Sequence, residues 1–286
     1  MIGLVTYGTH PDLTDDDRPL LRALAARGLD AAPVVWDTPG VPWSGFRALV
    51  MRSAWNYHAK PRAFTAWLTM LKERGIPLWN PVPVVRWNMH KRYLRDLERA
   101  GVAVPATEWV ARGDPRPLRT LLATRGWNDA IVKPAISASA TDTWRTTGDA
   151  VADDARFLEL AGRRDVLVQP AIPEVAANGE WSLMYLDGAF SHAMLKRPRA
   201  GDFRVQAEHG GTAERLEPPA ALVAAGSAVV AAIPGDWIYA RVDGVETARG
   251  FVLMELELIE PVLFLSESEG AAERLAAAVA RRIPGT

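Results

Sequence analysis

Short apolar runs alternate with longer segments of mixed polarity through the first third of the chain. Residues 2–7, 32–36 and 48–52 have the composition of buried strands, and a helix is predicted over residues 61–74, before another strand at residues 77–79. Strands that alternate with helices favour a parallel sheet with crossover connections. In such sheets ligands bind beyond the carboxyl ends of the strands, and the third strand is followed directly by a polar, aromatic run.

The first helix is predicted from its end signals. The aspartates at residues 15–17 supply carboxylates for the helix N-terminus, Pro19 suits the first turn, and Gly28 suits the left-handed residue that ends a helix. Residues 80–83, Asn-Pro-Val-Pro, are predicted to form a linker, because proline breaks helices and cannot donate to a strand ladder.

The rest of the chain mixes helices with further strands. A helix over residues 90–100 ends at Gly101, and a smaller α+β region extends to about Val168. Asp187-Gly188 between two apolar runs predicts a hairpin with a type I′ turn. The remaining predicted elements are helices over residues 219–232 and 273–282 and strands at residues 238–242 and 251–258.

Composition restricts the class of protein. The chain has 286 residues, of which 49% are hydrophobic and 23% charged, so we expect two or three packed subdomains. It has no cysteine, which excludes disulfides, thiolate metal sites and cysteine nucleophiles and favours a cytoplasmic location. The net charge is −1 with scattered basic residues, which argues against a nucleic-acid partner. No apolar run approaches the roughly 20 residues that span a membrane, so no membrane association is expected.

Three acidic residues near the end of the chain form a candidate metal site. Glu255 and Glu257 lie two apart in an apolar strand and point to the same face, where two carboxylates repel each other and are costly to desolvate. A divalent cation removes that conflict by taking oxygen ligands, and Asp243 ends the preceding strand as a third ligand. The alternative is a solvent-facing strand edge that carries charges.

Basic residues form two further signals. Residues 196–199 and 201–206, followed by a pair of glycines, suit phosphate binding by guanidinium and ammonium groups, although a basic hairpin end is usually solvated surface. Lys91 lies near a helix start and Lys133 ends an apolar strand; a single such lysine is normally a surface residue. The small, hydroxyl-rich residues 135–142 are interpreted as a mobile loop that covers a ligand.

The polar, aromatic run after the third strand is the candidate pocket for the acceptor substrate. Arg52 is expected to pair a carboxylate, and the aromatic rings to exclude water. In the alternative interpretation, Trp55 and Tyr57 pack between domains and Arg52 is structural. The predicted substrate residues are Arg52, Ser53, Trp55, Asn56 and Tyr57.

These blocks, in this order over residues 87–265, resemble the ATP-grasp superfamily. The resemblance implies a fold of mixed α/β and α+β class, an ATP-grasp fold preceded by a Rossmann-like pre-ATP-grasp domain. It implies a pre-ATP-grasp domain on the acceptor side at residues 1–86, a small ATP-grasp subdomain with both phosphate lysines at residues 87–168, and a large subdomain with the metal ligands at residues 169–286. ATP and Mg²⁺ are the implied cofactors, with Mn²⁺ as an alternative.

The resemblance also assigns expected roles. Lys91 and Lys133 are similar to the lysines that hold the α- and β-phosphates, and Glu174 to the acid that takes the ribose hydroxyls. Residues 168–172 resemble the hinge strand whose backbone contacts adenine, so Gln169, Ala171 and Ile172 are predicted to bind nucleotide. Lys196 and Arg204 resemble the γ-phosphate contacts. The remaining assignments are Asp243, Glu255 and Glu257 as Mg²⁺ ligands and Arg204, Lys196 and Arg241 as catalytic residues.

At three positions the chain departs from the family pattern, which affects the assignment of these roles to its residues. The third metal position is more often asparagine than glutamate, so Glu257 adds a negative charge. Residues 137–141 lack the glycines common in the covering loop. Pro170 has no N–H to offer to adenine.

Three stretches, residues 52–58, 86–94 and 255–261, resemble the D-cycloserine-forming ligases, which close O-ureido-D-serine to a ring with consumption of ATP. The predicted function is therefore activation of a small amino-acid-like carboxylate or carbonyl by phosphorylation and its capture by a nitrogen nucleophile. Alternatives are an intermolecular ligase for amino acids or dipeptides, a phosphotransferase that stops after phosphorylation, and a non-catalytic ATP-binding regulator. The eleven tryptophans leave a homodimer interface open.

Overall fold

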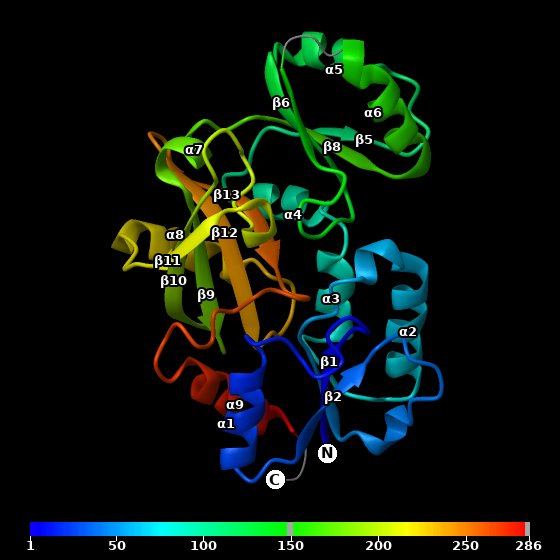
Figure 1. The fold of residues 1–286 in the computed structure, drawn as a ribbon, viewed down its shortest axis with the longest axis vertical. Helices are drawn as coiled ribbons and strands as arrows, with labels where there is room; N and C mark the ends of the chain where they lie inside the picture. Colours follow the sequence, from blue (N-terminus) through cyan, green and yellow to red (C-terminus); the bar gives the residue numbers. More distant parts are fainter. Residues whose placement is uncertain (148–150, 284–286) are drawn as a thin grey trace.

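The N-terminal part of the chain forms a parallel four-stranded sheet. The computed structural model describes residues 1–147 and 151–283. The strand order is β2-β1-β3-β4, and all three pairings are parallel, which confirms the predicted crossover sheet (Figure 1). Its elements are β1 (Ile2–Thr6), α1 (Arg18–Ala26), β2 (Ala31–Val35), β3 (Ala48–Met51), α2 (Pro61–Glu73) and β4 (Leu78–Trp79), with short 3₁₀ turns at Trp43–Gly45 and Tyr57–Ala59.

The predicted cap of the first helix is wrong in its chemistry. α1 begins at Arg18, with Pro19 in its first turn as expected, but Asp17 makes no side-chain cap. Its carboxylate instead accepts hydrogen bonds from Arg52 Nε at 2.7 Å and Ser53 Oγ at 2.7 Å. The helix end does not need this carboxylate, because the Arg18 N–H donates to the Thr14 carbonyl oxygen at 3.2 Å and Pro19 has no N–H, whereas a buried guanidinium needs a counter-charge.

The predicted linker at residues 80–83 is also wrong. Pro81 occupies the N-cap position of α3 (Val82–Asn88), and Pro83 lies in its first turn. Proline begins this helix because its missing N–H falls among groups that have no partner inside the helix. α4 (Tyr93–Arg99) follows within the predicted helical stretch.

A small antiparallel sheet forms the part drawn at the top of Figure 1. Its strand order is β5-β8-β6-β7. The elements are β5 (Glu108–Val110), α5 (Leu118–Arg125), β6 (Asp129–Pro134), β7 (Trp144–Thr147), α6 (Val151–Arg163) and β8 (Val166–Pro170). Leu118, Val132 and Phe157 belong to a hydrophobic core whose members all come from this part.

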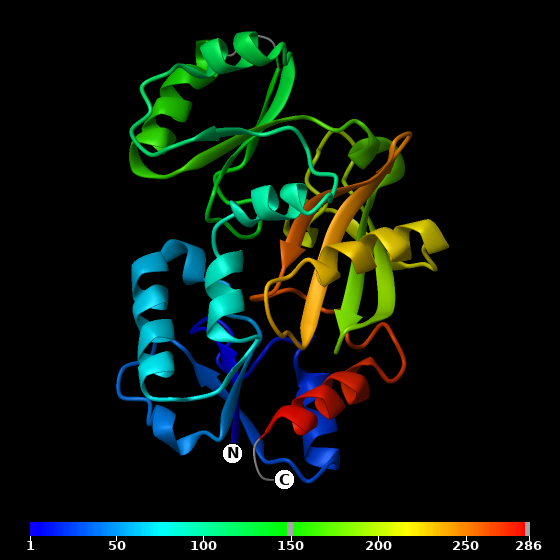
Figure 2. The same ribbon diagram turned by 180° about the vertical axis from the view of Figure 1, so that it is seen from behind.

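A five-stranded antiparallel sheet of order β11-β10-β9-β12-β13 carries the acidic block. Asp187 and Gly188, which join β9 to β10, have φ values of 52° and 85°, as the predicted type I′ turn requires. α8 covers one face of this sheet (Figure 2). The elements are α7 (Glu174–Asn178), β9 (Glu180–Leu186), β10 (Ala189–Arg197), β11 (Thr212–Arg215), α8 (Ala220–Ala231), β12 (Tyr239–Thr247) and β13 (Gly250–Glu257), with a 3₁₀ turn at Ala207–His209.

The last helix returns to the start of the chain. α9 (Ala271–Arg282) packs against α1, side by side in both views (Figures 1 and 2). One hydrophobic core includes Ile2 and Leu24 from the N-terminal part, Met184 and Tyr239 from the five-stranded sheet, and Leu275 from α9. The N-terminal sheet and the large sheet thus pack together through one shared hydrophobic core. The domain boundaries at residues 86 and 168 stay predictions. No helix in the described residues is long and apolar enough to cross a membrane.

Candidate active site

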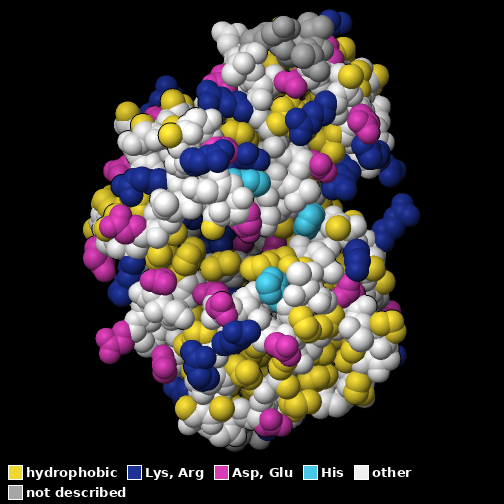
Figure 3. All heavy atoms as spheres, viewed as in Figure 1, with side chains coloured by type: hydrophobic (Ala, Val, Ile, Leu, Met, Phe, Trp, Pro, Cys, Tyr) yellow, Lys and Arg dark blue, Asp and Glu magenta, His cyan; other side chains and the backbone are white. Residues whose placement is uncertain are grey.

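A cavity of about 470 Å³ lies where the three parts of the chain meet. Its wall includes residues of both the small and the large sheet, and Figure 3 shows a recess between the upper and lower parts of this face, with hydrophobic, basic and acidic side chains around it. Most of the predicted site residues line it: Trp55, Lys91, Lys133, Gln169, Ala171, Ile172, Lys196, Arg204, Arg241, Asp243, Glu255 and Glu257. The structure therefore brings the separate sequence blocks to one place.

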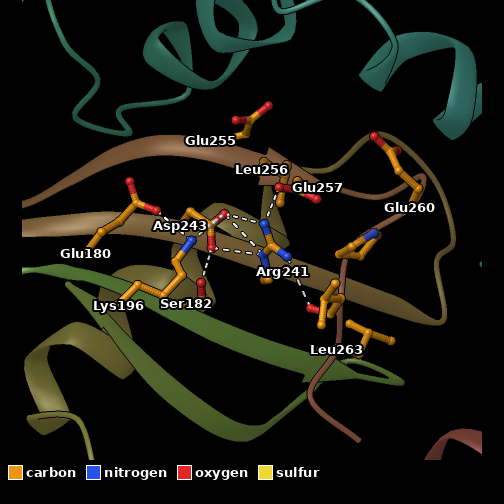
Figure 4. A network of polar contacts seen from close by, with 12 residues as sticks. Glu180, Ser182, Lys196, Arg241, Asp243, Glu255, Leu256, Glu257, Glu260 and Leu263 are labelled. Carbon is orange, nitrogen blue, oxygen red and sulfur yellow. Dashed lines mark hydrogen bonds and ion pairs between the residues drawn. The ribbon is translucent and has the colours of Figure 1, made fainter. Parts of the chain in front are cut away.

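Asp243 and Glu257 are joined through Arg241. On the paired strands β12 and β13, Arg241 lies opposite Glu257 and Asp243 opposite Glu255, so all four side chains share the cavity face. The Arg241 guanidinium donates to Asp243, with Nη2 at 2.9 Å from Oδ2, and also to Glu257 (Figure 4). Burial raises the pKa of Asp243, but the positive charges of Arg241 and Lys196 outweigh burial and lower it. Burial raises the pKa of Glu257 to about 7 despite Arg241.

Two lysines lie near Glu255: Lys91 from the turn before α4 and Lys133 from β6. Lys91 Nζ lies 2.8 Å from Glu255 Oε1 and donates to the carbonyl oxygen of Ser137 at 3.2 Å. Burial raises the pKa of Glu255, but the charges of Lys91 and Lys133 produce a net lowering. Burial lowers the pKa of Lys133 to about 8, although Glu255 opposes that shift. The site thus holds two ammonium groups around one carboxylate.

The predicted metal ligands have suitable oxygen atoms, but their carboxylates are paired with cationic side chains of the protein. Three carboxylates are the hard oxygen donors that Mg²⁺ takes. Among the described residues, however, no three acidic or histidine side chains are grouped closely enough to hold a metal ion. Arg241 stands between Asp243 and Glu257, and Lys91 holds Glu255. The chemistry of the donor set fits the ion, and the metal-binding role of Asp243, Glu255 and Glu257 stays a prediction.

The predicted hinge offers fewer free groups than expected. Gln169 is 2% exposed, and its side-chain amide donates to Thr107 Oγ1 at 2.9 Å. The Ala171 N–H donates to the carbonyl oxygen of Asp129 at 3.0 Å. Together with Pro170, which has no N–H, two successive hinge residues have no donor left for a ligand. Ile172 also lines the cavity.

Glu180 is a cavity residue that the sequence reasoning missed, whereas the predicted Glu174 does not line the cavity. Glu180 begins β9, and its Oε1 lies 2.7 Å from Lys196 Nζ, which also lies 3.5 Å from Asp243 Oδ2. The turn at residues 187–188 does not by itself predict this pairing, because the register changes along the hairpin. A register shift between Phe190 and His192 displaces the pairing by one residue and sets Lys196 opposite Glu180.

Arg204 lines the cavity on the segment between β10 and β11. Its guanidinium donates to both carboxyl oxygens of Asp202, with Nη2 at 2.8 Å from Oδ2. These bonds lower the pKa of Asp202 well below its ordinary value. The predicted role of Arg204 at the γ-phosphate stays a prediction.

Four of the five residues of the predicted acceptor pocket do not line the cavity, and their role in substrate binding stays a prediction. Arg52 and Ser53 are 1% and 2% exposed and bind Asp17, so neither faces the cavity. Asn56 accepts from Trp36 Nε1 at 2.6 Å and donates to Asp37 at 2.9 Å, and Tyr57 is 4% exposed in an aromatic core. The order of residues along the chain does not show whether a side chain that follows a strand points into the protein interior or toward a bound ligand. Of the five residues, only Trp55 lines the cavity.

The segment after β13, residues 258–263, is held by side chains from distant parts of the chain; we call it the strap. Each of its six carbonyl oxygens accepts a side-chain hydrogen bond. Backbone without a sheet partner needs such bonds when it is buried. The six donors, in chain order of the carbonyls, are Asn80, Tyr239, Trp55, Arg52, Arg241 and His192.

Known proteins resemble the whole chain. The family described as the N-terminal domain of D-cycloserine synthetase DcsG matches residues 2–80. The chain is 33% identical over 299 residues to the cycloserine biosynthesis protein DcsG of Streptomyces lavendulae, covering 99% of both chains. The crystal structure of D-cycloserine synthetase DcsG superposes with a TM-score of 0.88 at 31% identity, over 99% of each chain. The ATP complex of D-alanine–D-alanine ligase from Bacillus anthracis gives a TM-score of 0.71 at 16% identity, over 98% of this chain and 96% of that one, which shows the fold alone.

Proposed function

Since this chain belongs to the D-cycloserine synthetase family of ATP-grasp enzymes, we propose that it phosphorylates the carboxylate of a small amino-acid-like substrate and closes it to a ring through the substrate's own nitrogen. The chain is an ATP-dependent carbon–nitrogen ligase with an ATP-grasp fold. O-ureido-D-serine, which D-cycloserine-forming ligases cyclise, is the substrate that we propose.

This proposal depends mainly on one observation: two lysines and three carboxylates line the same cavity. The chain that carries this cavity also matches its relative over 99% of both sequences. Phosphoryl transfer needs positive groups around the phosphates, and Lys91 and Lys133 supply them from the small subdomain side. Asp243, Glu255 and Glu257 would hold Mg²⁺, which neutralises phosphate charge when bound.

The protein residues act by positioning and by electrostatics. Lys91 would transfer its hydrogen bond from Glu255 to a phosphate oxygen, which frees that carboxylate for the metal. The transferred phosphoryl group turns the substrate carboxylate into an acyl phosphate, whose phosphate leaves when nitrogen attacks the carbonyl carbon. Arg241, which already binds two carboxylates, would stabilise negative charge that develops there. Trp55 lines the wall and would help to exclude water from the acyl phosphate.

The test is ADP and phosphate release from Mg-ATP with a panel of amino acids, dipeptides and O-ureido-D-serine, with products identified by mass spectrometry. Phosphate release with O-ureido-D-serine matched by a cyclic product would support the proposal. A linear condensation product from two panel members would replace it with intermolecular ligation. A phosphorylated product that accumulates without a new carbon–nitrogen bond would replace it with simple phosphotransfer.

A further inference from the structure

Glu260 is a carboxylate of the cavity to which the reaction described above gives no role. It lies on the strap, is 8% exposed and lines the cavity. Within the described part of the chain, no hydrogen bond or ion pair joins its carboxyl group to another residue. Figure 4 shows this group outside the network of dashed contacts around Asp243 and Arg241. A carboxyl group that lines a cavity without a protein partner is available to pair with a ligand.

The backbone around Glu260 is fixed with unusual completeness. Trp55 Nε1 donates to its carbonyl oxygen at 2.8 Å. On either side, the Tyr239 hydroxyl donates to the Ile259 carbonyl at 2.9 Å and Arg52 Nη2 to the Pro261 carbonyl at 2.9 Å. These bonds come from the N-terminal part and from β12. Such support is typical of a side chain whose position matters, because a binding group acts only when its own backbone is held.

The charges around Glu260 favour a cationic ligand group beside its carboxylate. Burial, with the negative charges of Glu257 and Glu255, raises the pKa of Glu260 well above its ordinary value, while the charges of Lys91 and Arg241 oppose the shift. Those two cations are already bonded elsewhere, Lys91 to Glu255 and Arg241 to Asp243 and Glu257. A positively charged ligand group would therefore relieve the burial of this carboxylate more than a neutral or negative one.

An ammonium group fits this position well. An ammonium group needs only one carboxylate and is attracted to aromatic rings. Trp55 lines the same cavity and stands 6.0 Å from Tyr7 and 5.6 Å from His10, centroid to centroid, in an aromatic cluster beside the strap.

We propose that Glu260 binds the α-ammonium group of the amino-acid-like substrate and thereby selects amino acids over other carboxylic acids. This inference rests on the proposed function, since it names how the same cavity recognises its substrate. The carboxylate of the substrate then lies toward Arg241 and the phosphoryl group, and the ammonium group lies toward the strap. The N-terminal part contributes to this end of the cavity through Trp55 rather than through Arg52.

The experiment compares each amino acid of a panel with the analogue that carries hydrogen in place of the α-amino group, including O-ureido-D-serine and its deamino analogue. ADP release gives kcat/KM for the wild type, for Glu260→Gln and for the matched control Glu267→Gln, an exposed residue of the following segment. We expect the wild type and the control to prefer the amino acid by about 30-fold or more, the range of a hydrogen bond between charged groups. In Glu260→Gln this preference should fall to about threefold or less, with KM for ATP within about twofold of wild type.

The possible results test the role of Glu260 separately from the proposed substrate. A wild type that uses the deamino analogue as well as the amino acid overturns the role of Glu260, whether or not the variant folds. A variant that keeps the wild-type preference overturns it as well. Turnover of another amino acid, with none of O-ureido-D-serine, overturns the proposed substrate, and the comparison within that other pair still decides the role of Glu260. Absence of turnover with every amino acid overturns both.

Discussion

Lys91 and Glu255 form an ion pair across the cavity, with Nζ 2.8 Å from Oε1. Lys91 lies in the turn before α4 and Glu255 on β13, and Lys91 is 6% exposed. The buried ammonium group of Lys91 is neutralised by the half-buried carboxylate of Glu255, which lowers the cost of burying this charge when no ligand is bound. The same pair must separate before phosphate and metal can take its members, so nucleotide binding exchanges one set of ion pairs for another.

Glu255→Gln should abolish most of the ATP-dependent reaction. The amide keeps the shape of the side chain but loses the charge that pairs Lys91 and that would bind Mg²⁺. We expect kcat/KM for ATP to fall by about 100-fold or more, the usual cost of one group that stabilises transferring charge. The control is Glu246→Gln on the neighbouring strand, whose side chain is exposed. Activity of Glu255→Gln above a tenth of wild type would contradict the predicted metal role.

Arg52→Met should destabilise the fold without a specific effect on substrate binding. It removes the partner of Asp17, which is 1% exposed, and the donor to the Pro261 carbonyl. Loss of one partner of a buried ion pair costs about 3–5 kcal/mol of unfolding free energy, to be measured in urea. Arg18→Met breaks an exposed pair with Asp15 and should cost less than about 1 kcal/mol. A stable Arg52 variant with a raised substrate KM would restore the acceptor-pocket interpretation.

Glu180→Gln should raise KM for ATP by about tenfold, because it removes a charged hydrogen bond to Lys196 inside the cavity. Glu174→Gln should leave KM within about twofold, since Glu174 does not line the cavity. Steady-state kinetics with ATP as the varied substrate checks both. The opposite ranking would favour the original assignment of the ribose contact to Glu174.

Lys133 should make ATP capture sensitive to mildly alkaline pH. Burial lowers its pKa to about 8, so the ammonium form is present below that pH and is lost above it. Only the charged form pairs with phosphate, and kcat/KM for ATP should therefore decline as pH rises through about 8. Lys133→Arg retains its charge at these pH values and should remove this decline. A profile that is unchanged between wild type and Lys133→Arg would exclude Lys133 as the titrating group.

The sequence predicted those features that depend on neighbouring residues. Alternation of short apolar runs with helical segments was enough for the parallel sheet, and the Asp187-Gly188 turn was enough for its hairpin. The carboxylates of the cavity were recognised because their spacing within a strand fixes the face to which they point, whereas the two lysines were assigned through the family resemblance.

Features that depend on distant partners were not predictable in this way. Asp17 resembles a helix cap by its local position, but it binds Arg52, 35 residues away in the chain. The pairing of Glu180 with Lys196 depends on a register shift that the turn residues do not predict. The strap has no regular structure, so no periodic pattern marks it. In each case tertiary contacts overrode or lay outside the local signals.

The strap also determines which parts of the molecule can move. Its carbonyls are bonded from the N-terminal part, from β10 and from β12, and a shared core joins the same elements. We therefore expect these parts to move together. Most apolar residues of the small sheet form a core of their own, although Leu167 packs with the large sheet, so a hinge motion that admits nucleotide would displace the small sheet against the other parts. Lys133 would travel with that lid, whereas Glu260 and Glu257 would keep a constant separation throughout the cycle.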